Sequence, residues 1–270
     1  MYTTLIGAED LAALSTDVRV FDCRFDLADA DAGGRRYAEG HIREAAYLHL
    51  NNDLSGAVEP GRTGRHPLPD LGVFRAMLKA NGVDSKTQVV AYDDMGGMFA
   101  ARLWWMVRWS GHRAVAVLDG GYQAWLDREG THTASDSARA PAPPPVSMRL
   151  VREHVDAATW TLLDARASDR FRGENETIDP VAGHIAGALN APFQANLGDD
   201  GRFLESTTLR RRFEALLADE GDKPVVCYCG SGVTAAHNVL AMVHAGMPEP
   251  ALYPGSWSEW ITDPGNPVAT

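Results

Sequence analysis

The feature that most constrains how this chain can fold is an internal duplication. Four blocks of its first half recur in the second half, in the same order and at slowly drifting intervals: 18–24 with 161–166, 40–46 with 183–188, 89–93 with 225–229, and 120–125 with 255–260. A period of this length is that of a complete domain and is far longer than a solenoid repeat. The sequence therefore predicts a duplicated domain with small insertions and deletions.

A proline-rich stretch separates the two copies. Within 141–145, four of the five residues are proline, and such a composition favours an extended, semi-rigid linker. We therefore expect a first domain over residues 1–135, a linker over 136–147 and a second domain over 148–270.

Each copy alternates short β-branched runs with helical patterns. The runs at 89–90, 115–118 and 225–226 are typical of buried parallel strands, and apolar residues of 235–243 recur at the spacing of one helix face. This alternation predicts an α/β fold in which each domain is an open parallel sheet flanked by helices. Such sheets bind ligands at the carboxyl ends of their strands.

The charge balance narrows the set of partners. The chain has 25 Lys and Arg against 36 Asp and Glu, a formal net charge of -11, so we expect it to repel nucleic acid and anionic membrane surfaces. No apolar run approaches the roughly 20 residues of a membrane span, and the N-terminus lacks a signal-peptide pattern. Three cysteines are too few for a disulfide framework. These features predict a cytoplasmic protein with free thiols.

One cysteine is placed where a parallel sheet binds its ligands. Cys229 ends the buried run of 225–229, and a glycine-bearing turn, 230–234, leads from it into a helix. Glycines let backbone N–H groups turn toward the sulfur, and the helix N-terminus adds positive potential there. Both effects lower the pKa of a thiol and favour a nucleophilic thiolate, whereas the alternative is a buried, inert cysteine. The same N–H groups suit an anionic donor or a persulfide, and the backbone predicted to bind the donor is that of Gly230, Gly232, Val233 and Thr234.

The segment 229–235, Cys-Gly-Ser-Gly-Val-Thr-Ala, resembles the active-site loop of the rhodanese superfamily in the form found in 3-mercaptopyruvate sulfurtransferases. The two Gly-His-Ile blocks and the closing 255–260 block also resemble tandem-domain rhodaneses. The resemblance implies a catalytically silent first domain and a second domain whose Cys229 carries sulfur as a persulfide, without a cofactor or a metal. The partners it implies are a small anionic sulfur donor and a thiophilic acceptor, with a protein thiol left open as acceptor.

The resemblance also assigns the donor-binding residue. Arg170 matches the arginine that binds the anionic donor in these sulfurtransferases, and a planar guanidinium suits a carboxylate or sulfonate. The nearby Arg172 is the weaker candidate. In mercaptopyruvate enzymes a second arginine follows, and the segment 174–180 contains none.

A proton relay is the second implication of the resemblance. His41 matches a first-domain histidine that lies with an aspartate and the loop serine, here Ser231, and histidine suits proton transfer near neutral pH. Asp29 and Asp31 both lie near the expected place of the aspartate. The alternative for His41 is a histidine that bonds the backbone, as we expect for His184.

Two further residues receive no catalytic role at this point. Cys227 lies inside the predicted strand, where a core side chain is the simplest interpretation. His66 lies in a proline-framed loop, 65–69, that could reach the domain interface.

These observations predict a sulfurtransferase that moves sulfane sulfur from 3-mercaptopyruvate to cyanide or a thiol through a Cys229 persulfide. The neutral Gly230 and Ser231 favour mercaptopyruvate over the doubly charged thiosulfate, whereas the missing second arginine argues against it. The alternatives are a thiosulfate:cyanide sulfurtransferase with the same mechanism and a persulfide carrier without turnover.

The residues at two positions argue against phosphate transfer by this chain and against sulfur transfer by its first domain. Ala235 stands where the longer loop of a related phosphatase would end in a phosphate-binding arginine. In the first copy Asp93, followed by Asp94, stands where Cys229 stands in the second. A carboxylate cannot accept sulfane sulfur in this way, so we expect the first domain to be silent.

Overall fold

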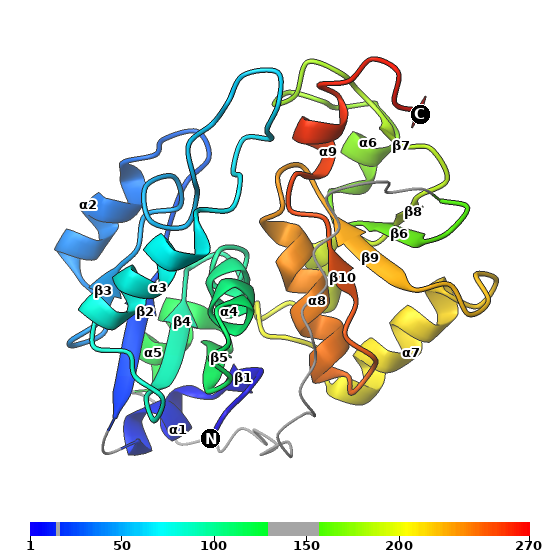
Figure 1. Ribbon diagram of the computed structural model, residues 1–270. Coiled ribbons are helices and arrows are strands. Elements are labelled where there is room, and N and C mark those ends of the chain that lie inside the picture. Colours follow the sequence, from blue (N-terminus) through cyan, green and yellow to red (C-terminus); the bar gives the residue numbers. More distant parts are fainter. Residues whose placement is uncertain (15–16, 129–156) are drawn as a thin grey trace. The chain divides into compact units, whose positions relative to one another are not determined.

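The computed structural model describes residues 1–14, 17–128 and 157–270 (Figure 1). It divides into two compact units, each with its own core. The described residues of unit 1 fall within Met1–Gly56, Pro69–Val146 and Asp199–Phe203, and those of unit 2 fall within Ala57–Leu68, Ser147–Gly198 and Leu204–Thr270. Each unit therefore takes a short segment from the other half of the sequence, which the expected boundaries did not anticipate. The predicted linker, 136–147, lies outside the described residues.

Unit 1 is built on a five-stranded sheet in the order β1-β5-β4-β2-β3, and all of its strand pairs are parallel. The strands are β1 (Leu5–Ile6), β2 (Val18–Asp22), β3 (Ala46–Tyr47), β4 (Gln88–Tyr92) and β5 (Val115–Leu118). The helices are α1 (Ala8–Ala13), α2 (Ala32–Glu39), α3 (Leu71–Ala80), α4 (Ala100–Trp109) and α5 (Gly121–Asp127). The apolar β4 and β5 are buried along their whole length, as expected of central parallel strands.

Unit 2 repeats this plan with a four-stranded parallel sheet in the order β10-β9-β6-β8. Its strands are β6 (Thr161–Asp164), β8 (Leu189–Asn190), β9 (Val225–Tyr228) and β10 (Ala251–Leu252), and β7 (His184–Ile185) pairs with β11 (Val268–Ala269) in an antiparallel ribbon. Its helices are α6 (Ser168–Phe171), the 3₁₀ turn η1 (Phe193–Asn196), α7 (Ser206–Leu216), α8 (Thr234–His244) and α9 (Ser256–Trp260). Two parallel sheets flanked by helices confirm the predicted α/β fold. None of the helices in the described ranges has the length and apolar character needed to cross a membrane.

A buried ion pair recurs at the end of the second-copy strand β6 and its first-copy counterpart β2. In unit 1 the Arg24 guanidinium donates to both Asp22 carboxylate oxygens and, over 2.6 Å, to the carbonyl of Gly40. In unit 2 Arg166 binds Asp164 in the same way and donates to the carbonyl of Gly183 over 2.8 Å. The pair therefore ties the strand end to the Gly-His-Ile block in each unit, which explains why both blocks recur together.

The turn after β4 is closed by the side chain of Asp93. One carboxylate oxygen accepts the N–H groups of Met95 and Gly97 at 2.8 and 2.9 Å, and the other accepts those of Phe99 and Ala100 at 2.7 and 2.8 Å. Burial raises the pKa of Asp93, and these hydrogen bonds oppose that shift. The turn thus holds a carboxyl group of the protein itself on four backbone N–H donors.

We predict that Asp93→Ala destabilises unit 1 by at least about 3 kcal/mol, because it leaves several buried N–H groups without an acceptor. Urea unfolding measures the loss, and hydrogen exchange of the β4–α4 turn localises it. Asp94→Ala is the control, since Asp94 forms only a partly exposed ion pair with Arg36 and such pairs contribute about 0–1 kcal/mol. Equal destabilisation by both variants would contradict the role of Asp93.

Candidate active site

Cys229 directly follows β9, and the turn after it leads into α8. Its side chain is almost wholly enclosed, with 2% of the residue exposed. Gly232 lies in the left-handed region at φ 76°, and a Cβ there would lie 2.3 Å from the carbonyl oxygen of Pro254. Only glycine fits this position, so the sequence of the turn sets its shape.

The beginning of α9 holds the backbone on which Cys229 sits. The Ser256 hydroxyl accepts the N–H of Cys229 at 3.0 Å, and the N–H of Trp257 donates to the Cys229 carbonyl at 2.9 Å. The N–H of Ser258 donates to the carbonyl of Gly230 at 2.9 Å. These bonds leave the cysteine backbone little freedom to reorient.

The segment 57–68, although it lies in the first half of the sequence, packs against this turn as part of unit 2. A Cβ on Gly64 would lie 2.6 Å from the carbonyl oxygen of Gly255. The N–H of Arg65 donates to the Ser258 hydroxyl at 3.1 Å. The segment thereby places the side chains of the two residues that follow Gly64 beside the cysteine turn.

His66 is the histidine that meets Ser231. Its Nδ1 lies 2.7 Å from the Ser231 hydroxyl oxygen, and both residues are buried, with 7% and 5% exposed. Ser231 follows Cys229 by two residues, so this hydrogen-bonded pair lies close in sequence to the thiol. Sequence reasoning noted His66 and assigned it no role.

His41, which the resemblance placed in the relay, has a different environment. It belongs to unit 1, where its Nδ1 bonds the Tyr37 carbonyl at 2.8 Å and its ring stacks on Tyr37 at 3.9 Å. His184 repeats these contacts with Phe171 in unit 2, at 2.7 and 3.6 Å. The backbone-bonding alternative therefore describes the contacts of both histidines. The relay role of His41 stays a prediction, and the histidine that bonds Ser231 in unit 2 is His66.

The two proposed aspartate partners do not complete a relay with His41. Asp29 is exposed and forms an ion pair with Arg35, and Asp31 is exposed at the start of α2. Neither carboxylate hydrogen-bonds a histidine in the described part of the chain.

Two guanidinium groups converge beside Gly230, the residue that follows Cys229. A Cβ on Gly230 would lie 2.9 Å from Nη2 of Arg65, and 3.7 and 3.8 Å from Nη1 and Nη2 of Arg170. Burial lowers the pKa of Arg65, while the nearby Cys229 raises it and Arg170 lowers it again. Arg170 thus lies beside the turn of Cys229, and Arg65 joins it there as a residue that the sequence interpretation missed.

Buried carboxylates pair with both arginines. Arg170 donates through Nε and Nη2 to Glu176, at 2.8 to 3.2 Å, and through Nη2 to Asp179 at 3.2 Å. Arg65 forms an ion pair with Asp179 through Nη1. The Glu176 and Asp179 side chains are each only 3% exposed.

Each guanidinium retains a nitrogen for a ligand. Among the described residues, Nη1 of Arg170 and Nη2 of Arg65 have no hydrogen-bond partner, and both lie beside Gly230. Arg172, the weaker candidate, is exposed and pairs with Glu174. An anionic group could therefore take one hydrogen bond from each of the two converging arginines.

The remaining predicted residues line the start of α8. Thr234 is the first residue of the helix and Val233 precedes it, and both are buried. Cys227 is fully buried within β9, and burial, with a further contribution from Cys229, raises the pKa of its thiol. Cys227 is therefore a core side chain, as expected.

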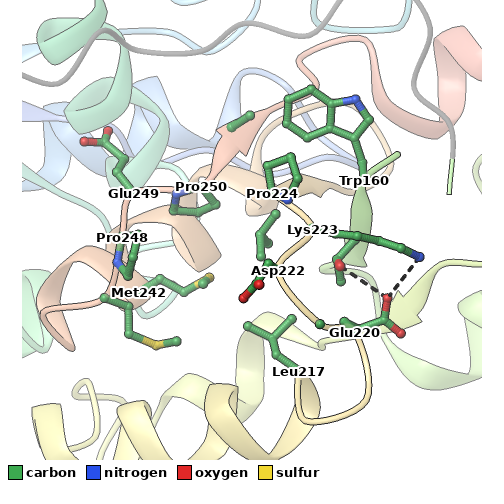
Figure 2. A pocket seen from close by; sticks show the side chains of 15 residues that line it. Trp160, Leu217, Glu220, Asp222, Lys223, Pro224, Met242, Pro248, Glu249 and Pro250 are labelled. Atoms are coloured by element: carbon green, nitrogen blue, oxygen red, sulfur yellow. Dashed lines mark hydrogen bonds and ion pairs between the residues drawn. The ribbon is translucent and has the colours of Figure 1, made fainter. Parts of the chain in front are cut away.

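A separate cavity of about 340 Å³ lies at the other end of the same sheet (Figure 2). Trp160, Pro224 and Pro250 line it, next to the amino-terminal ends of β6, β9 and β10. Its charged side chains include Glu220 and Lys223, which pair with each other at 3.9 Å. Ligands of parallel sheets bind at the carboxyl ends of the strands, and this cavity lies at the amino-terminal ends.

The sequence matches the family described as the rhodanese-like domain twice, over residues 7–128 and 147–263. This chain belongs to the rhodanese family. It is a tandem-domain sulfurtransferase, and the match covers both units, including the turn of Asp93 and the turn of Cys229.

Similar proteins align with this chain along nearly its whole length. The chain is 49% identical to a Pseudomonas aeruginosa protein named "Probable 3-mercaptopyruvate sulfurtransferase", over 98% of each chain. It is 32% identical to the thiosulfate sulfurtransferase of Bos taurus, over 97% of this chain and 93% of that one. The structure of 3-mercaptopyruvate sulfurtransferase from Leishmania major superposes with a TM-score of 0.78 at 32% identity, covering 96% of this chain and 74% of that chain.

We predict that Cys229→Ser abolishes sulfur transfer from any donor, whereas Cys227→Ser retains most of it. Cys229 lies in the turn, and the thiol of Cys227 is buried with a raised pKa. Mass spectrometry after donor treatment should find one added sulfur on the peptide that carries Cys229, in the wild type and in Cys227→Ser. Equal loss of activity in both variants would instead indicate a relay between two cysteines.

Proposed function

We propose that this sulfurtransferase takes sulfur from 3-mercaptopyruvate and passes it to a thiophilic acceptor through a persulfide on Cys229. The Cys229 thiolate attacks the donor sulfur and forms an S–S bond. The C–S bond of the donor breaks, and its electron pair stays on the carbon as the enolate of pyruvate. A proton completes pyruvate, and cyanide or a thiol then removes the outer sulfur and restores the thiolate.

The hydrogen bond between Ser231 and His66 is the observation that carries this proposal. Transfer from mercaptopyruvate requires a proton at the leaving carbon, and transfer from thiosulfate releases sulfite without one. A buried hydroxyl–imidazole pair two residues from the nucleophile supplies a proton path that only the first reaction needs.

The two converging arginines provide the place for the donor carboxylate. One carboxylate oxygen would accept from Nη1 of Arg170 and the other from Nη2 of Arg65, since both nitrogens face Gly230. The persulfide's negative charge would be held by backbone N–H groups of the turn, as the turn of Asp93 holds a carboxylate in unit 1.

Thiosulfate is the second candidate donor, because a sulfonate could use the same arginine nitrogens. The 32% identical bovine relative bears that substrate's name, and the 49% identical relative bears the name of mercaptopyruvate. A donor comparison in variants of the proton path separates the two.

We predict that His66→Asn lowers kcat with 3-mercaptopyruvate by about 100-fold, the usual contribution of a positioned general acid, and changes kcat with thiosulfate by less than about threefold. Steady-state rates with cyanide as acceptor measure both. Ser231→Ala should show the same split between donors. An equal loss with both donors would contradict the proton path, and a split produced by His41→Asn would return the relay to that residue.

Arg170→Ala should lower kcat/KM for the true donor by one to two orders of magnitude. A charged hydrogen bond contributes roughly 1.5–3 kcal/mol, and each 1.36 kcal/mol is about tenfold in rate. Arg170→Lys should recover only part of the loss, because an ammonium lacks the planar fork. If Arg170→Ala stays within about twofold of the wild type for both donors, the donor does not bind there.

A further inference from the structure

The charges around the donor position cancel. We define the arginine cluster as three guanidinium groups and three carboxylates joined by ion pairs in unit 2: Arg65, Arg166 and Arg170 with Asp164, Glu176 and Asp179. Its formal charge is therefore zero. The enclosed carboxylates are poorly screened by solvent, so the two donor-facing arginines act in a field that their own partners largely neutralise.

Asp179 differs from the other two carboxylates in what it contacts. Asp164 accepts the N–H of Arg166, and Glu176 accepts the N–H groups of Ile178 and Asp179, so both shape the backbone. Within the described residues, the carboxylate of Asp179 bonds only Arg65 and Arg170. Its carboxylate therefore contacts the two donor-facing guanidinium groups and, within the described residues, accepts no backbone N–H.

We infer that Asp179 is a donor-specificity residue that disfavours a donor with two negative charges relative to a donor with one. The inference rests on the proposed function, because it concerns the same donor position. The segment 174–180 has no second arginine, and under this inference its acidic residue Asp179 contributes to donor selectivity by setting the charge of the site.

The geometry supports discrimination by charge rather than by size. Arg65 and Arg170 each offer one nitrogen, and together they match the two oxygens of one carboxylate. A second negative charge on the donor would meet no further unpaired cation of the arginine cluster and would be repelled by Asp179 at short range. Thiosulfate carries two charges, and 3-mercaptopyruvate with a protonated thiol carries one.

The test is the isosteric variant Asp179→Asn. The ratio of kcat/KM for thiosulfate to kcat/KM for 3-mercaptopyruvate should rise about tenfold, because removal of one nearby charge acts on one additional donor charge in a medium of protein-like dielectric. The ratio of the two kcat/KM values cancels any change that affects both donors equally. Glu174→Gln is the matched control: Glu174 lies in the same segment, is exposed and pairs with Arg172, so the ratio should stay at the wild-type value.

A second measurement does not need turnover. Iodoacetate and iodoacetamide alkylate the same thiol and differ by one negative charge. Asp179→Asn should raise the rate constant of Cys229 with iodoacetate relative to iodoacetamide by about tenfold, on the same electrostatic grounds. The neutral reagent reports any change in access to the sulfur, and thermal unfolding reports whether the variant is folded.

The outcomes separate this inference from the proposed function. A wild-type protein that forms no Cys229 persulfide with either donor overturns the proposed function, and the alkylation ratio still tests the charge effect. A wild type that transfers sulfur, with donor and alkylation ratios unchanged in Asp179→Asn, overturns the inference alone. A rise of equal size in Glu174→Gln also overturns it, because the effect would then reflect the overall charge of the protein.

Discussion

The buried pair of Asp164 and Arg166 is the interaction on which the site depends. Arg166 donates through Nε and Nη2 to Asp164 and through Nη2 to the carbonyl of Gly183. Its Nη1 lies 3.4 Å from a carboxylate oxygen of Glu176. Glu176 in turn orients Arg170. A buried pair of this kind is costly to desolvate, so it contributes a defined geometry more than stability. Through its contacts, the end of β6, the Gly-His-Ile block that contains β7, and Arg170 are held in fixed positions relative to one another.

The turn that recurs in the two units has a similar backbone geometry but carries a different side chain in each. In unit 1 the turn after β4 encloses the carboxylate of Asp93 and satisfies it with backbone N–H donors. In unit 2 the corresponding position is Cys229. The N–H of Trp257 donates to the Cys229 carbonyl, as the N–H of Tyr122 donates to the Asp93 carbonyl in unit 1. The two turns therefore differ in one side chain, a carboxyl group in unit 1 and a thiol in unit 2, within a shared backbone geometry.

Sequence reasoning identified the features formed by neighbouring residues, and it missed the site residues that come from the other half of the sequence. The repeats, the strand that ends at Cys229 and the glycines after it are adjacent in sequence, so their physical meaning could be predicted. Arg65 and His66 lie in 57–68, a segment without periodic apolar residues between β3 and α3, and nothing local shows that it packs into unit 2. The signal that could have been used is the adjacent pair of Arg65 and His66, which is followed by Pro67. The segment of the second half that belongs to unit 1, 199–203, contains no histidine.

A neutralised arginine cluster also suits the reaction proposed for this chain. The carboxylate of 3-mercaptopyruvate survives unchanged in pyruvate, so an interaction with it stabilises donor, transition state and product about equally. Such uniform binding lowers KM without raising kcat, and a stronger anion clamp would retain the product. Selective stabilisation must instead act on the charge that moves, from the sulfur of Cys229 to the leaving carbon. In this structure the groups placed to act on that charge are the backbone donors of the turn and the pair of Ser231 and His66.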